Sequence, residues 1–590
     1  MNNTPDKTKT DTTLQTTPNS WFFERGIPLI FWGFFSVLLL AYYGRAIADP
    51  DFWWHLKSGD VMLNQGHLLN IDPFNYTGDV VVHRREAVIL KGYWLWQCAA
   101  ALLYRIWGFY GIFVLKAGTL LLMAGGLMRE MRRQAVSPFL QQLLIGLGAV
   151  VLLGGYGGFT LERPQIFSFI FVTFLLGMVA RIRMGQKPSW LLLPLMAVWS
   201  NIHGGIVVGD ILLALFAAGA IVQYRNDRAR LALLLCWAMA GILASFFNPT
   251  GWETAIELFS FSRQNLSNQI DEYRSSWVQF SDVKLIGLLW VIAGLHLAGL
   301  FFSRNIFWPE IIISIFLLAF GLRYLRNIPF IALSMLPMTG WYLDRALARL
   351  GHSRTRIWQL GVLIILSTLF VWQTTNELRQ RNNGWPVARY FPENMARFLR
   401  DSGLSGHLFN EYTTGGYLNW VLFPKWQTFI DGRGLNYSVY NVYKEIFLAE
   451  GSHEMLLEQY QIDVVALNIF KDGKVNFLLI SLLNNSRWIP VYLDSNCFVL
   501  ARDTEKNSAA IRRFKVNKNI FLNSILLRCY SVLHASPENF DLTVGYTELL
   551  ICAGKYPEAE IMINKMERMR PGAEIISMLR RSIDTSNIRK

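Results

Sequence analysis

Eleven apolar segments occupy the first part of the chain and constrain its fold more than any other feature. A helix of about 20 apolar residues crosses a hydrocarbon core of roughly 30 Å. Only helices and closed barrels span a bilayer, because each backbone polar group there needs a partner within the protein. The pattern therefore predicts a polytopic α-helical membrane domain over residues 28–374, with about eleven transmembrane helices. The segments are 28–48, 109–128, 138–157, 165–180, 189–202, 204–222, 229–247, 283–302, 307–322, 328–344 and 357–374.

The chain carries fewer charges than a water-soluble protein of its length. Charged residues make up 17% of its 590 residues and hydrophobic ones 52%, whereas soluble proteins average about 25% charged residues. The net charge is +14, but Lys and Arg cluster in short loops between apolar segments and form no continuous basic stripe. This distribution is typical of a membrane protein and argues against a nucleic-acid partner.

The same basic residues predict an orientation. With a cytoplasmic N-terminus, the loops on the cytoplasmic side hold 14 Lys and Arg in 41 residues, and the outer loops hold 10 in 114. Positive residues favour the cytoplasmic side of a membrane. We therefore expect residues 1–27 to form a disordered cytoplasmic tail, residues 49–108 a long first outer loop, and all residues after 375 to lie outside the cytoplasm.

The composition changes after residue 375, where a water-soluble region is expected. Short runs rich in Val, Ile and Phe alternate with helical patterns, which predicts an α/β domain over 375–515. The expected strands are Thr428–Ile430, Val464–Ile469, Val491–Asp494 and Phe498–Ala501.

Residues 516–590 are helical in pattern throughout. The stretch Tyr546–Ala559, with a turn at Gly554 and with Pro571 after it, resembles a tetratricopeptide helix pair. A plain helical cap on the α/β domain is an equal alternative. The five cysteines show no metal-ligand spacing; Cys529 and Cys552 are the pair considered for a disulfide, and the expectation is against one.

The first outer loop opens with two carboxylates, Asp49 and Asp51, directly after an apolar segment. Crowded and partly desolvated carboxylates suit proton abstraction or metal binding. Trp53 and Trp54 follow at once, and we expect them to anchor the membrane interface. The alternative is that the acids only end a helix in water. Residues 93–107 are apolar but too short to span, which predicts a helix lying along the outer leaflet.

Three further outer loops are very short, and each carries ionisable groups. They hold Glu162 with Arg163, His203, and Arg323 with Arg326. Short loops keep these side chains near the membrane, on the face that holds the two carboxylates, and ionisable groups at such depth are functional candidates. Cations beside carboxylates at headgroup level suit a phosphate-bearing lipid. The alternative is that the basic side chains only extend to the outer interface.

Several motifs resemble the GT-C superfamily of integral-membrane glycosyltransferases, which includes oligosaccharyltransferases, protein O-mannosyltransferases and lipid A aminoarabinose transferases. The resemblance covers roughly residues 25–500, its first motif is the most specific, and the phrases are similar to those of a bacterial group. It rests on Asp49-x-Asp51-x-Trp-Trp-His55-Leu, Gly66, Asp72-Pro73-Phe74, Arg163-Pro-Gln, Trp199-x-Asn201-x-His203-Gly204, Gly415-Gly-Tyr-Leu and Asp431-Gly-Arg433.

The resemblance implies an enzyme of the bacterial plasma membrane that moves a sugar from a polyprenyl-phosphate-linked donor to a protein, lipid or glycan acceptor at the outer face, with inversion. It implies that Asp49 or Asp51 is the base or positions the acceptor, and Asp49 is preferred because it lies nearer the helix exit. Arg163, His203 and Arg326 are candidates for the donor phosphate.

His55 and Lys57 are weaker candidates for substrate binding, and Glu86 is the nearest match to an acid that related proteins place before the interfacial helix. Some members of the superfamily bind a divalent metal through the Asp-x-Asp pair and others bind none, so Mg²⁺ or Mn²⁺ stays open here. Further oxygen ligands for a metal would have to come from Glu253, Glu257, Asp271 and Glu272.

Two other classes of function stay open. A lipid or solute transporter or flippase would use the same charged cavity, although the chain lacks the paired half-repeats of many transporters. A silent envelope scaffold would instead bind a protein partner through residues 523–590. For Asp431 and Arg433, a turn or structural ion pair is favoured over a substrate contact, because Gly after Asp is a turn signal.

Overall fold

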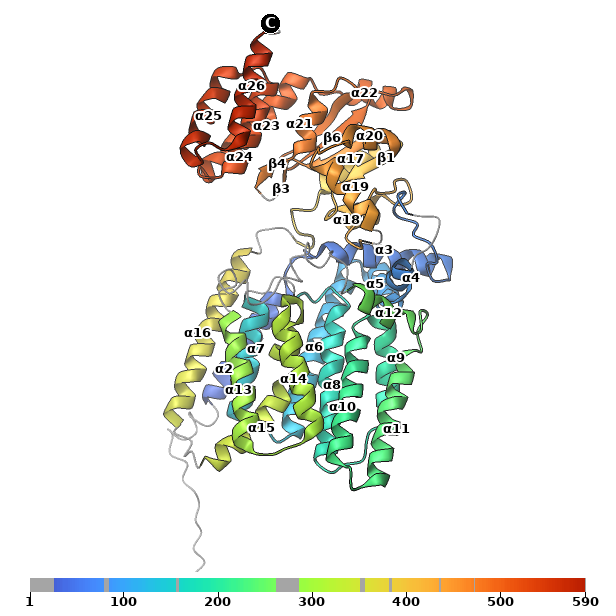
Figure 1. Ribbon diagram of the computed structural model, residues 1–590, viewed down its shortest axis with the longest axis vertical. Coiled ribbons are helices and arrows are strands. Elements are labelled where there is room, and N and C mark those ends of the chain that lie inside the picture. The colour runs from blue at the N-terminus through green and yellow to red at the C-terminus, as the bar shows by residue number, and fades with distance from the viewer. Residues whose placement is uncertain are drawn as a thin grey trace, which may run out of the picture.

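The computed structural model describes residues 26–78, 84–154, 159–261, 286–350, 356–380, 385–434, 437–471 and 473–588. It consists of a helical bundle, a layer of short helices across one end of that bundle, and a C-terminal part that lies beyond this layer (Figure 1). The predicted tail 1–27 falls almost entirely outside the described residues.

Each of the eleven apolar segments contains a helix of the bundle. Four of these helices, α6, α8, α10 and α11, are long and apolar enough to cross a membrane, so the prediction of a polytopic helical protein is confirmed at this level. The number of eleven crossings stays a prediction. The helices are α2 (Ile27–Tyr43), α6 (Phe109–Arg133), α7 (Pro138–Gly154), α8 (Gln165–Arg183), α9 (Leu192–Ile202), α10 (Ile206–Gln223), α11 (Arg228–Ser245), α13 (Ile286–Ser303), α14 (Trp308–Arg323), α15 (Leu336–Arg349) and α16 (Arg356–Gln380).

The first and last helices of the bundle pack side by side. The ring of Phe370 on α16 lies 5.3 Å from that of Phe31 and 5.7 Å from that of Phe35 on α2. These rings are among the buried aromatic residues of the large apolar core. The contact brings the exit of α2, which leads into the first outer loop, close to the chain that leaves α16.

The layer at the end of the bundle is formed by α3 (Pro50–Gln65), α4 (Arg84–Lys91), α5 (Trp94–Trp107) and α12 (Glu253–Phe261) (Figure 1). Helix α5 confirms the helix expected at 93–107, while its position along a leaflet stays a prediction. The expectation that Trp53 and Trp54 anchor the interface is wrong, because these side chains are only 0% and 6% exposed. Trp53 packs instead on α18 (Gly415–Leu422), where its ring lies 4.8 Å from that of Trp420.

The C-terminal part contains a four-stranded sheet in the order β1-β2-β6-β5. Strand β1 (His407–Asn410) is parallel to β2 (Ile462–Asn468), and the pairs of β6 (Cys497–Arg502) with β2 and with β5 (Trp488–Leu493) are antiparallel. Three of the four expected strands are present. A small hairpin of β3 (Phe470–Lys471) and β4 (Lys474–Val475) follows β2. Helices α17 (Glu393–Asp401), α19 (Tyr437–Phe447), α20 (His453–Gln459), α21 (Phe477–Leu483) and α22 (Ser508–Phe514) complete this region.

The expected strand Thr428–Ile430 is wrong, and β1 takes its place in the sheet. Thr428 makes only isolated bridges, one to Leu408 of β1 and one to Asn75 of the first outer loop. The side chain of Asn410 accepts a hydrogen bond from the Phe429 N–H at 2.9 Å, so a side chain replaces the ladder partner there. The segment therefore joins the first outer loop to the sheet edge.

The tail consists of four helices, α23 (Lys518–Ala535), α24 (Phe540–Cys552), α25 (Tyr556–Met569) and α26 (Glu574–Ile588). The predicted turn at Gly554 separates α24 from α25, and its φ of +70° is one that glycine adopts without strain. Whether this pair is a tetratricopeptide unit stays a prediction. All five cysteines are free.

Candidate functional site

The two carboxylates of the first outer loop lie at the start of α3. Asp49 is the N-cap residue, and its Oδ1 accepts a hydrogen bond from the Asp51 backbone N–H at 2.8 Å. Pro50 occupies the first helical position, where no donor is needed. The side chain of Asp49 is 1% exposed and that of Asp51 is 28% exposed. Asp51 therefore offers the more accessible carboxylate of the pair.

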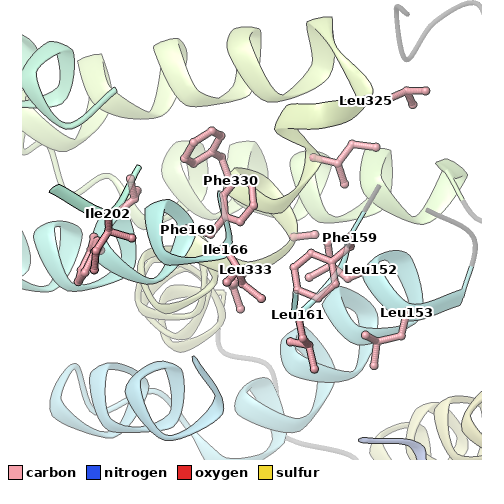
Figure 2. Close-up of a cluster of buried hydrophobic side chains, with 14 of the residues drawn as sticks. Leu152, Leu153, Phe159, Leu161, Ile166, Phe169, Ile202, Leu325, Phe330 and Leu333 are labelled. Atoms are coloured by element: carbon pink, nitrogen blue, oxygen red, sulfur yellow. The ribbon is translucent and has the colours of Figure 1, made fainter. Parts of the chain in front are cut away.

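Arg163 joins the two carboxylates. Its Nε donates to Asp49 Oδ2, and its second terminal nitrogen lies 3.2 Å from Asp51 Oδ2. The loop that carries Arg163 is anchored in the bundle, because Phe159 and Leu161 point into its apolar cluster (Figure 2). The Thr160 hydroxyl, between these two residues, donates to Asp49 Oδ2 at 3.1 Å, which holds the loop beside the start of α3.

A polar cavity of about 320 Å³ lies against Asp49 and Arg163. Lys116 of α6 lines it, and its Nζ forms a buried ion pair with Glu162 Oε1 at 2.7 Å. Arg45, at the exit of α2, also lines it and pairs with Glu377 of α16. Each cation of this wall thus has a carboxylate partner, so the cavity is polar and close to neutral.

His203, predicted together with Arg163 and Arg326 for the donor phosphate, lies within electrostatic range of both arginines. His203 follows α9, and its Nδ1 accepts from the Gly205 backbone N–H at 2.9 Å and lies 2.7 Å from Ser168 Oγ. An accepting Nδ1 puts the proton of the neutral ring on Nε2. Burial, then the charges of Arg326 and Arg163, lower the pKa of His203 to about 3. His203 is therefore a neutral donor with two arginines in its electrostatic environment.

His55 lies one turn after Asp51, inside the layer of short helices. Its ring stacks on Trp54 with centroids 3.5 Å apart, and its Nδ1 contacts the Gln97 amide at 3.1 Å. Burial, together with the charges of Arg163, His203 and Arg433, lowers the pKa of His55 well below its usual value. The ring of Tyr93 lies 5.3 Å from His55 and 5.5 Å from His203, so it connects the two histidines.

The remaining predicted residues lie away from this group or outside the described part. Lys57 pairs with Asp60 at 3.6 Å, and its ammonium lies 5.5 Å above the Phe423 ring. Glu86 belongs to α4, but its side chain lies outside the described residues. The structure thus brings Asp49, Asp51 and Arg163 into direct contact. His203 and His55 lie within electrostatic range of Arg163, and Arg326 lies within electrostatic range of His203.

Sequence reasoning missed Arg45, Lys116 and Tyr390. The sequence contained a signal for Arg45 and Lys116, because each is a charged residue inside an expected apolar segment. Arg45 lies near the end of segment 28–48, and Lys116 lies within segment 109–128. Tyr390 belongs to the chain after α16, which pairs with the chain before Asp49 through the isolated bridge of Ile47 with Val387. Burial, then the charge of Asp49, raises the pKa of Tyr390. No local sequence pattern predicts that pairing.

The described residues at this site do not fit a divalent metal. A guanidinium already contacts both carboxylates of the Asp-x-Asp pair. Within the ranges that the structure describes, no group of three or more His, Cys, Asp and Glu side chains could hold an ion. Glu253 and Glu257 belong to α12, whereas Asp271 and Glu272 lie outside the described residues.

No protein-family model matches the chain, and no curated protein sequence matches it. Solved structures of similar fold include the archaeal oligosaccharyltransferase AglB of Archaeoglobus fulgidus with an inhibitory peptide and a dolichol-phosphate. The TM-score is 0.47 at 12% identity, over 82% of this chain and 75% of that one. A second is ArnT of Cupriavidus metallidurans bound to undecaprenyl phosphate, with a TM-score of 0.46 at 13% identity, over 82% of this chain and 98% of that one.

A third is the Archaeoglobus fulgidus oligosaccharyltransferase in complex with Zn and sulfate. Its TM-score is 0.42 at 11% identity, over 81% of this chain and 73% of that one. Two of these three structures are thus named as oligosaccharyltransferases, and the third is named as ArnT.

Proposed function

We propose that the chain is a membrane glycosyltransferase of the GT-C kind, which moves a sugar from a polyprenyl-phosphate-linked donor to an acceptor at the outer face. The position of Arg163 carries this proposal. It contacts an acidic pair, and together with Arg326 it contributes to the basic environment of His203. A transfer that needs a base for the acceptor and cations for a leaving phosphate needs these two kinds of group next to each other.

The acceptor side is the carboxylate pair. We assign proton acceptance to Asp51, because its side chain is 28% exposed, and a positioning role to Asp49, whose two oxygens bind the α3 terminus and Arg163. The acceptor oxygen attacks C1 of the sugar with inversion, the bond from C1 to the phosphate oxygen breaks, and the acceptor proton passes to the carboxylate.

The donor side is basic. The leaving polyprenyl phosphate gains negative charge as the bond breaks, and Arg163 and Arg326 would neutralise it. Neutral His203 would donate its Nε2 proton in a hydrogen bond to a phosphate oxygen, because its Nδ1 already accepts.

The first test uses the purified chain in vesicles with the radiolabelled sugar-lipid fraction of the host membrane. We expect Asp51→Asn and Asp49→Asn each to lower sugar transfer to the host acceptor fraction by about 100-fold or more, the size of an acid–base contribution. The matched control is Asp401→Asn, since the Asp401 side chain is 67% exposed. Full activity of both site variants would contradict the assignment. Label that enters vesicles without a new glycosidic bond would instead favour a transporter.

A further inference from the structure

A tight turn of the C-terminal part touches the carboxylate to which we assign proton acceptance. The turn is Asp431, Gly432 and Arg433. A Cβ atom on Gly432 would lie 2.5 Å from Asp51 Oδ1, closer than real Cβ contacts allow. The backbone of the turn therefore lies directly against the Asp51 carboxylate, although the two residues are far apart in sequence.

The backbone conformation of the turn does not explain this glycine. Gly432 is absent from the residues with positive φ, whereas Gly434 has a φ of +53°. Position 432 is therefore open to an L-residue as far as its backbone is concerned. A side chain there would require the Asp51 carboxylate to move.

The turn is held firmly on both sides of Gly432. Arg433 is fully buried and pairs with Asp431 at 2.5 Å and with Asp72 of the first outer loop at 2.8 Å. Asp431 also accepts a hydrogen bond from the Asn419 amide at 2.9 Å. The Tyr412 hydroxyl donates to the Gly432 carbonyl at 3.0 Å. These contacts confirm the ion pair expected from the sequence and leave the turn little freedom.

We infer that Gly432 is a positioning residue for the transfer reaction: its bare backbone sets the place of the Asp51 carboxylate, and the buried Asp72–Arg433–Asp431 group holds Gly432 there. The C-terminal part thus completes the active site. This inference rests on the proposed function. It explains why the position of the Asp51 carboxylate matters: when a catalytic group is displaced by about 1 Å, the reaction can slow by about 100-fold.

The test compares Gly432→Ala with Gly118→Ala on α6, where an added Cβ meets no atom within 4 Å. In the vesicle assay with the radiolabelled sugar-lipid fraction, we expect Gly432→Ala to lower kcat at least tenfold and to leave KM for the sugar-lipid unchanged, because the added Cβ meets the Asp51 carboxylate, which is assigned to the acceptor. Gly118→Ala should match the wild type in both. Wild-type kcat for Gly432→Ala, or a rise in KM alone, would overturn the inference.

Tyr412→Phe is a second variant in case Gly432→Ala does not fold. It removes the hydrogen bond to the Gly432 carbonyl, keeps the aromatic ring, and should lower kcat several-fold at an unchanged thermal unfolding midpoint. Wild-type kcat in this variant would also count against the inference.

A crosslinking arm separates this inference from the proposed function. The pair Asp51→Cys with Gly432→Cys should form a disulfide under mild oxidation, and Asp51→Cys with Gly118→Cys should not. No crosslink would overturn the inference by itself. If the wild type transfers no sugar while the double variant Asp51→Cys with Gly432→Cys still forms the disulfide, the proposed glycosyltransferase activity is refuted. Any role of the turn in sugar transfer is then refuted with it.

Discussion

At the scale of single residues, the site depends on one guanidinium that meets carboxylates from another loop. That Asp49, Arg163 and His203 share one face could be predicted, because short loops keep ionisable groups at a common depth. The pairing itself could not. The ion pair of Arg163 with Asp49 requires Phe159 and Leu161 to anchor the Arg163 loop in the apolar core. It also requires the first apolar segment to end so that Asp49 lies at the same depth in the molecule as Arg163. Such a match depends on packing among distant helices.

The environment of His55 leads to a prediction about pH and stability. Its pKa is lowered in the folded chain, chiefly by burial, whereas an unfolded histidine titrates near 6.5. Below pH 6.5 the unfolded chain takes up a proton that the folded chain does not, so folding stability falls as the pH falls. The loss from this residue is about 1.4 kcal/mol per pH unit until the folded pKa is reached.

Thermal unfolding between pH 7.5 and 5 checks this expectation. His55→Gln should show a shallower loss of stability toward low pH than the wild type, since Gln has no proton to gain. His67→Gln is the control, because His67 is exposed, and it should keep the wild-type slope. An equal slope for His55→Gln and the wild type would show that His55 titrates alike in both states.

At the scale of elements, α3 determines where the carboxylates lie. The start of α3 could be predicted in principle, because Asp followed by Pro is a strong helix-start signal. The packing of α3 against α18 could not be predicted. Trp53 and Trp54 have the sequence signature of interface anchors, but α18 covers them, and Gly416 of α18 approaches the Pro50 carbonyl so closely that a Cβ would lie 3.0 Å from it. Local pattern cannot tell a lipid interface from a later protein surface.

Trp53 should therefore contribute more to stability than an interface anchor would. It is fully buried, and its ring lies 5.1 Å from Tyr417 and 5.3 Å from Phe391. We expect Trp53→Ala to cost about 3–5 kcal/mol, the usual range for a buried aromatic, and to increase trypsin cleavage of the C-terminal part. Trp372→Ala, on a side chain that is 45% exposed, should change stability by less than about 0.5 kcal/mol. Similar effects of both variants would contradict the packing described.

At the scale of the whole molecule, the first outer loop is bound to the sheet. Arg433 joins Asp72 across 361 positions of sequence, and the Tyr76 ring stacks on His407 with centroids 4.2 Å apart. Three strands of the four-stranded sheet and all eleven apolar helices could be predicted, because their signals are local periodicities. The contact between the first outer loop and the C-terminal part could not be predicted. Nothing in the Asp72 motif or in the Asp431 motif indicates that the two lie together in the fold.

This contact also sharpens the predicted topology. Since α3 and α18 are in contact, the first outer loop and the C-terminal part must lie on one side of the membrane, and the basic loops predict that this side is the outer one. Met455→Cys, at a position 62% exposed in the C-terminal part, should react with a membrane-impermeant maleimide in intact spheroplasts, measured against the wild-type background. Gln186→Cys, in an exposed basic loop at the other end of the bundle, should react only after permeabilisation. The reverse labelling would place the proposed active site in the cytoplasm, where a nucleotide-linked sugar would be the available donor.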